Sequence, residues 1–131
     1  MRSRIIVGSL LLVASLPIGA AVSRSAAAPT VKWAVVNLAD ATRIAGVFVS
    51  GPVVFVHDDA KMAAGQPCTS VHRYDPAKGA GEEIVAFHCT PRWGKAPQKF
   101  TTATNRQPNG PPVMTEYQFA GDEEAHIVPI R

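Results

Sequence analysis

The feature that most limits how this chain can fold is its composition after residue 27, where leucine almost disappears. Only Leu38 remains in that part, against 12 valines, 4 isoleucines and 8 threonines. Branching at Cβ restricts χ1 and favours extended backbone over helix. Proline and glycine recur at short intervals between the apolar runs, as turns between strands require. The composition therefore predicts an all-β fold, mainly antiparallel.

The runs between these turn residues have the length of strands. One short helix is expected after Asp58 or Asp59, over residues 60–64, with Gly65 ending it. About seven strands in about 100 residues indicate a small sandwich or barrel, between which the pattern does not decide. The clearest strand alternates apolar and polar residues with a period of two. The expected strands are 31–38, 42–50, 52–57, 68–75, 82–90, 98–105 and 112–120.

The first 27 residues have the order of a secretory signal peptide. Arg2 and Arg4 precede a mainly apolar segment, and Pro17 and small residues follow it. The apolar segment is shorter than the about 20 residues that a membrane-spanning helix needs, so no transmembrane anchor is expected after cleavage. Cleavage is expected after residue 27, or alternatively after residue 21, and residues 28–131 are expected to form a single β domain. This domain is expected to be periplasmic or secreted.

The charge of the expected mature domain argues against nucleic-acid binding. The full chain has a net charge of +3, but residues 28–131 hold ten basic and ten acidic side chains. A neutral domain has no general field for a polyanion. The chain also lacks a Gly-x-Ser-x-Gly elbow, a phosphate loop and a dinucleotide fingerprint, so no organic cofactor is predicted and a non-enzymatic protein is favoured. A hydrolase would need a cleft that gathers Glu116 with His57 or His88.

Two cysteines, Cys68 and Cys89, are expected to form a disulfide, as cysteine pairs in exported proteins commonly do. If Asp75 pairs with Glu82 in an antiparallel hairpin, the same register places Cys68 opposite Cys89. A disulfide that closes a loop of about 20 residues stabilises a fold by about 3 kcal/mol in the chain-entropy model. Two alternatives remain open: a redox-active pair, although no Cys-x-x-Cys motif is present, and a zinc site that uses both thiolates.

Three histidines are candidate metal ligands: His57, His88 and His126. Imidazole and carboxylate suit zinc or copper. The spacing of the histidines matches neither a blue-copper site nor a His-x-x-x-His pair. The acidic segment 122–124 lacks the alternating ligands of a calcium loop. For each histidine a structural role remains the alternative, with His57 at the edge of the core. The neighbouring Glu123 and Glu124 are interpreted as a solvated turn.

Several short motifs along the expected domain resemble small exported bacterial proteins of uncharacterised function. This resemblance implies export but no activity, cofactor or partner. The motifs are His57-Asp58-Asp59, Pro67-Cys68, Phe87-His88-Cys89 and Glu116-Tyr117-Gln118-Phe119-Ala120-Gly121-Asp122.

The leading hypothesis from the sequence is a non-enzymatic exported β domain that binds an unknown protein or an envelope component. Trp93, beside Arg92 in a proline-bounded loop, is the expected contact residue. The alternative for Trp93 is a side chain folded over the open end of the core. The second hypothesis is a periplasmic zinc- or copper-binding protein that uses its histidines.

Overall fold

The computed structural model describes residue 28 and residues 30–131. The predicted signal peptide, residues 1–27, lies outside the described residues. None of the helices in the described part of the chain has the length and apolar character needed to cross a membrane.

The described chain is mostly β, which confirms the predicted class. Eight strands form one mixed sheet in the order β4-β3-β2-β1-β7-β8-β5, and β6 pairs with β7 beside this path. All the pairings are antiparallel except one parallel bridge, between Arg43 of β1 and Val113 of β7. The elements are β1 (Val31–Ile44), β2 (Val47–Asp58), α1 (Asp59–Ala63), β3 (Thr69–Asp75), β4 (Gly79–Phe87), β5 (Thr90–Trp93), β6 (Thr101–Gln107), β7 (Gly110–Gln118) and β8 (Glu124–Ile127).

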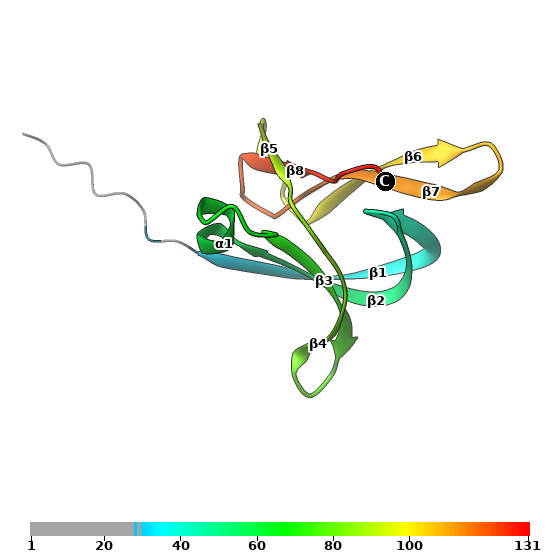
Figure 1. Ribbon diagram of the computed structural model, residues 1–131, viewed down its shortest axis with the longest axis horizontal. Helices are drawn as coiled ribbons and strands as arrows, with labels where there is room; N and C mark the ends of the chain where they lie inside the picture. The colour runs from blue at the N-terminus through cyan, green and yellow to red at the C-terminus, as the bar shows by residue number, and fades with distance from the viewer. Residues whose placement is uncertain (1–27, 29) are drawn as a thin grey trace, which may run out of the picture.

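The sheet is open, with β4 and β5 at the ends of its order, and it folds over on itself (Figure 1). Strands β1 to β4 form one part, and β5 to β8 form the part above it in the view. The apolar core lies between the two parts. Phe55 of β2 packs against Tyr117 of β7 with ring centroids 5.2 Å apart, and against Phe100 at 5.3 Å. Aromatic contacts therefore hold the two parts of the sheet together.

The first hairpin differs from the prediction. A two-residue turn joins Ile44 to Val47, and both of its residues have positive φ, 46° at Ala45 and 88° at Gly46. Such a turn matches the twist of paired strands. The predicted strand 42–50 ran through this turn because alanine gives no turn signal. The predicted break before residue 52 was also wrong, because Pro52 pairs with Asn37 inside β2.

The register predicted for the hairpin of β3 and β4 was wrong. Asp75 pairs with Gly79 and not with Glu82, and its carboxylate accepts hydrogen bonds from the backbone N–H groups of the turn. Gly79, which follows the three-residue turn 76–78 and begins β4, has a φ of 81°, a left-handed conformation that favours glycine. Irregularities on both sides of His72 then shift the pairing along the strands. Val71 consequently faces Val85, one step from the predicted register.

The predicted helix is confirmed, and a strand that was not predicted follows β7. Asp58 caps α1 by accepting hydrogen bonds from the N–H groups of Ala60 and Lys61. The segment interpreted as a solvated turn contributes Glu124 to β8. Pairing with both β5 and β7 overrides the acidic composition of that segment.

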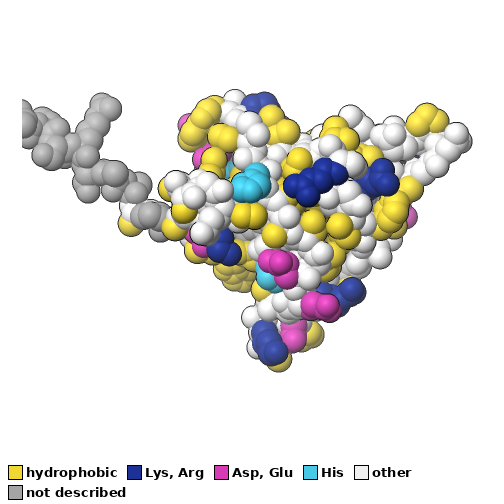
Figure 2. Space-filling model, viewed as in Figure 1, with side chains coloured by type: hydrophobic (Ala, Val, Ile, Leu, Met, Phe, Trp, Pro, Cys, Tyr) yellow, Lys and Arg dark blue, Asp and Glu magenta, His cyan; other side chains and the backbone are white. Residues whose placement is uncertain are grey.

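On the face that Figure 2 shows, basic and acidic side chains are interspersed among apolar and uncharged ones. This distribution agrees with the equal number of acidic and basic residues after residue 27. A mixed surface of this kind does not focus a field of one sign.

Candidate metal centre

Two cysteines and two histidines from four places in the chain converge at one end of the core. His57 is the penultimate residue of β2, and Cys68 directly precedes β3, whose first residue, Thr69, pairs with His57. Cys89 lies in the short link between β4 and β5. His126 lies in β8, where it is the partner of Pro91 in β5. The sheet order thus places the ends of distant strands beside one another.

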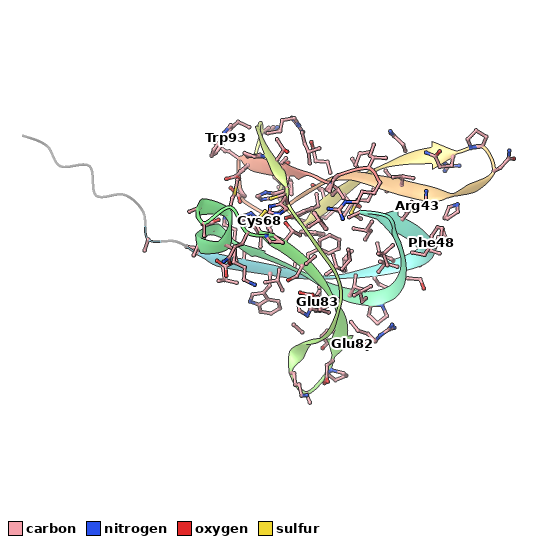
Figure 3. The ribbon with its side chains drawn as sticks, viewed as in Figure 1. Arg43, Phe48, Cys68, Glu82, Glu83 and Trp93 are labelled. Atoms are coloured by element: carbon pink, nitrogen blue, oxygen red, sulfur yellow. The ribbon has the colours of Figure 1, made fainter. Side chains whose placement is uncertain are left out.

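Three of these four residues have ligand atoms close enough to share one ion, and His126 lies beside them. His57, Cys68 and Cys89 offer ligand atoms that all lie within 4.8 Å of one another. Nδ1 of His126 lies 3.6 Å from Sγ of Cys89, and the rings of His57 and His126 have centroids 4.1 Å apart. Figure 3 shows Cys68 inside the molecule, between the two parts of the sheet and close to α1. We call His57, Cys68, Cys89 and His126 the Cys2His2 cluster.

The two sulfur atoms are in direct contact, but the structure does not confirm the predicted disulfide. They lie 2.6 Å apart, whereas a covalent S–S bond measures about 2.05 Å. Both cysteines are free thiols in the structure, and the backbone N–H of Cys89 donates to Sγ of Cys68 at 3.2 Å. The prediction that the two cysteines lie together is therefore confirmed, but the hairpin register from which it was made is wrong.

Both histidines of the cluster are buried and uncharged. His57 is 1% exposed and His126 is fully buried. Burial, which disfavours the imidazolium, lowers the pKa of His57 and, with the neighbouring His57, lowers the pKa of His126 to about 4. Among the described residues, three of their ring nitrogens have no hydrogen-bond partner: Nδ1 and Nε2 of His57, and Nε2 of His126. Neutral imidazole with free nitrogen atoms is the form that binds a metal.

Carboxylates lie next to these rings. Oδ1 of Asp59 lies 3.3 Å from Nδ1 of His57, and Oε1 of Glu124 lies 3.7 Å from Nδ1 of His126. Asp59 is itself held by the backbone N–H and the hydroxyl of Thr30. Metal-bound histidines commonly have an acidic partner on the nitrogen that does not bind the ion, and Asp59 has this place for His57 when Nε2 is the ligand atom. Glu124 instead lies near Nδ1 of His126, the nitrogen that also faces Cys89.

A buried aromatic side chain, Tyr117, lies against the cluster. The ring of Tyr117 stacks on His126 with centroids 4.9 Å apart, and its hydroxyl hydrogen-bonds that of the buried Thr69. Burial raises the pKa of Tyr117 above its usual range. Burial, together with the neighbouring sulfur of Cys68, raises the pKa of the Cys89 thiol to about 12. In the absence of a metal, Cys89 is therefore a protonated thiol at neutral pH.

One ion pair lies between the start of β1 and the turn after β7. Nζ of Lys32 lies 2.5 Å from Oδ2 of Asp122. Burial opposes both charges. Even so, this contact raises the pKa of Lys32 and helps, with the backbone N–H of Glu124, to lower that of Asp122. Lys32 is also the strand partner of His57, so the pair lies directly beside the Cys2His2 cluster.

The remaining residues singled out in the sequence lie elsewhere. His88 is exposed. Trp93 is 70% exposed at the end of β5 and projects outward in Figure 3, so it does not cover the core. Arg92 binds Glu116 through two hydrogen bonds of 2.6 Å. Glu116 is thus paired with a cation, and the arrangement expected for a hydrolase does not form among these residues.

Sequence reasoning missed two features. The first is the position of His126 beside the cysteines. It depends on β8, and the acidic composition at the start of this strand gives no strand signal. The second feature is an exposed apolar row on β1, made of Val31, Trp33 and Val35, with Trp33 66% exposed. Its signal was present, because residues 31–36 are apolar at nearly every position and only one face of the strand can enter the core.

Comparison with known proteins adds no family to this picture: no protein-family model, curated protein or solved structure matches the chain.

Proposed function

We propose that this protein binds one zinc or copper(I) ion through the Cys2His2 cluster. The observation that carries the proposal is that His57, Cys68 and Cys89 offer ligand atoms within 4.8 Å of one another. Nδ1 of His126 lies 3.6 Å from Sγ of Cys89, and three ring nitrogens of the two buried histidines are unpartnered among the described residues. Leaving a buried polar atom unpaired costs about 1–3 kcal/mol. An ion bound by one nitrogen of each ring would remove that cost at the nitrogens that bind it.

The types of ligand point to these two metals. Zinc in structural sites takes four ligands, and Cys2His2 is a common set. Thiolate also selects copper(I) among the available metals. With four protein ligands the ion has no open position for a substrate, which favours storage, transfer or a structural role over catalysis. We therefore propose a non-enzymatic metal-binding protein.

Binding requires a small adjustment of the cysteines. Two thiolates on a tetrahedral zinc ion lie about 3.8 Å apart, since each Zn–S bond measures about 2.3 Å. Cys68 and Cys89 lie outside the paired segments of β3 and β4, but the carbonyl of Cys68 accepts a hydrogen bond from the backbone N–H of Asp58 at 2.9 Å. The separation therefore falls on the two side chains and on the link that holds Cys89. The predicted disulfide is the oxidised state of the same two residues in this proposal.

The test is the zinc and copper content of the protein purified under reducing conditions without a histidine tag. We expect about one ion per chain. Replacing Cys68 or Cys89 by serine, or His57 or His126 by alanine, should reduce the bound metal, whereas His88→Ala is the matched control and should retain it. The proposal would be overturned if the wild-type protein held only a trace of metal after incubation with zinc. It would also be overturned if all the variants retained as much metal as the wild type.

A second candidate function is favoured by the exposed row of Val31, Trp33 and Val35. Val31 and Trp33 border an apolar groove of about 250 Å³ that Val54, Val56 and the turn of the β3–β4 hairpin also line. Exposed aromatic and branched residues in a row are typical of protein contact surfaces. This surface supports the binding of an envelope protein by an exported domain. We favour it as the point of contact, with the surface around the exposed Trp93 as the alternative.

A photo-crosslinking residue placed at position 33 or 93 tests this candidate in the cell. A defined crosslinked product from position 33, and none from position 93, is expected. Products from position 93 alone would return the contact to the surface around Trp93, and equal products from both positions would refute the row as the binding surface.

A further inference from the structure

The position of the two cysteines suggests how the proposed centre is regulated. Cys68 precedes β3 and Cys89 follows β4, so the two residues are joined by neighbouring strands and not by a flexible loop. Their sulfur atoms already touch, and the backbone N–H of Cys89 donates to Sγ of Cys68. Two sulfurs held in this way can either share one metal ion or bond to each other.

We propose that oxidation of Cys68 and Cys89 to a disulfide releases the metal, so that the cluster is a redox-controlled metal site. This inference rests on the proposed function. Both sulfurs are required as thiolates to hold the ion, and a disulfide sulfur is a poor ligand. His57 and His126 alone would leave the ion with two of its four ligands.

The reaction needs a two-electron oxidant, and we assign that role to a disulfide of low molecular mass or of another protein. One metal-bound thiolate attacks a sulfur of this disulfide and displaces one thiolate. The second cysteine thiolate then attacks the mixed disulfide, forms the bond between Cys68 and Cys89, and displaces the other thiolate. The two cysteines lose two electrons, the oxidant gains them, and zinc leaves as Zn²⁺ with its charge unchanged.

The order of attack follows from exposure. Cys68 is 4% exposed, whereas Cys89 is only partly buried, in the link to the edge strand β5. Cys89 is therefore the sulfur that an incoming disulfide reaches first, and Cys68 is the resolving residue. The expected export would carry the centre into oxidising surroundings, where this reaction is favoured.

The test uses the zinc-loaded, reduced full domain with oxidised glutathione as the probe. Released zinc is followed with a chromogenic chelator, and free thiols are counted in the same samples. We expect the loss of two thiols for each zinc ion released, and rebinding of zinc after reduction. Cys68→Ser should instead stop at a mixed disulfide on Cys89, detected by mass spectrometry as a glutathione adduct.

The outcomes separate this inference from the proposed function. If the reduced protein never binds zinc, the proposed function fails and the inference fails with it. If the reduced protein binds zinc but keeps it after both thiols are lost, the proposed function stands and the redox control is overturned. Thiols that stay reduced in excess oxidised glutathione would also overturn the redox control alone.

Discussion

His57 and His126 are the residues whose surroundings are hardest to explain without a ligand. Each is buried among apolar and aromatic side chains, and burial keeps each ring neutral. Buried polar atoms normally have a hydrogen-bond partner, but three of these four nitrogens lack one among the described residues. The metal centre accounts for their burial and for the nearby sulfurs together.

Zinc binding at pH 7 should release at least one proton per ion. Cys89 is protonated at this pH because its pKa is raised to about 12, and only its thiolate binds zinc. The histidines release none, because they are already neutral. Calorimetric titration in two buffers of different ionisation enthalpy measures the release. Heats that do not depend on the buffer would contradict the prediction.

Tyr117→Phe should lower the free energy of unfolding by about 1–3 kcal/mol, because it leaves the buried hydroxyl of Thr69 without its partner. The ring that stacks on His126 remains, so zinc binding should be unchanged. Urea unfolding of the reduced protein measures the loss. The double variant with Thr69→Val should recover much of the stability, and a further loss in that variant would refute the explanation.

At the scale of elements, the tight turn between β1 and β2 sets the register of the longest hairpin. Gly46 has a φ of 88°, and a Cβ there would lie 3.4 Å from Cβ of Arg131. Gly46→Ala should therefore cost about 1–2 kcal/mol of stability. Gly110→Ala is the matched control, because its Cβ would meet no atom within 4 Å and should cause little change. Equal losses in thermal unfolding would contradict the prediction.

The edge strand β5 is tied to β7 by the ion pair of Arg92 and Glu116. Hydrogen bonds from Arg92 hold the pKa of Glu116 below its ordinary value of 4.5. The pair therefore contributes stability above about pH 4.5, and this contribution is lost as the pH falls through the lowered pKa. Arg92→Ala should be less stable than the wild type at pH 7, and the difference should shrink at lower pH. Urea unfolding at several pH values checks this trend, which a constant difference would contradict.

The element patterns that the sequence predicted well were those determined locally. The existence of β7 and the capping of α1 by Asp58 depend on neighbouring residues, and both are present in the structure. The prediction that only one face of β7 is buried was wrong, because the adjacent Val113 and Met114 are both buried, as are the adjacent Tyr117 and Gln118. The positive φ of Ala45 and the pairing of β8 were missed, because a small apolar residue and an acidic segment give no such signal. The register of β3 and β4 was wrong because a left-handed Gly79 shortened the loop.

At the scale of the whole molecule, the site depends on contacts between strands that are far apart in the sequence. Both cysteines and all three candidate histidines were singled out individually, but the strand order was needed to join four of them and to separate His88. Strand order is set by long-range pairing, such as that of β5 with β8, which a single sequence does not reveal. The fold therefore turns scattered polar residues into one buried group.

The most direct measurement of the central claim is the zinc X-ray absorption spectrum of the reduced, zinc-loaded protein. The proposed centre predicts one ion per chain with two sulfur neighbours at about 2.3 Å and two nitrogen neighbours at about 2.0–2.1 Å. A spectrum with only nitrogen and oxygen neighbours would show that zinc binds elsewhere. That result would leave the Cys2His2 cluster without a metal role.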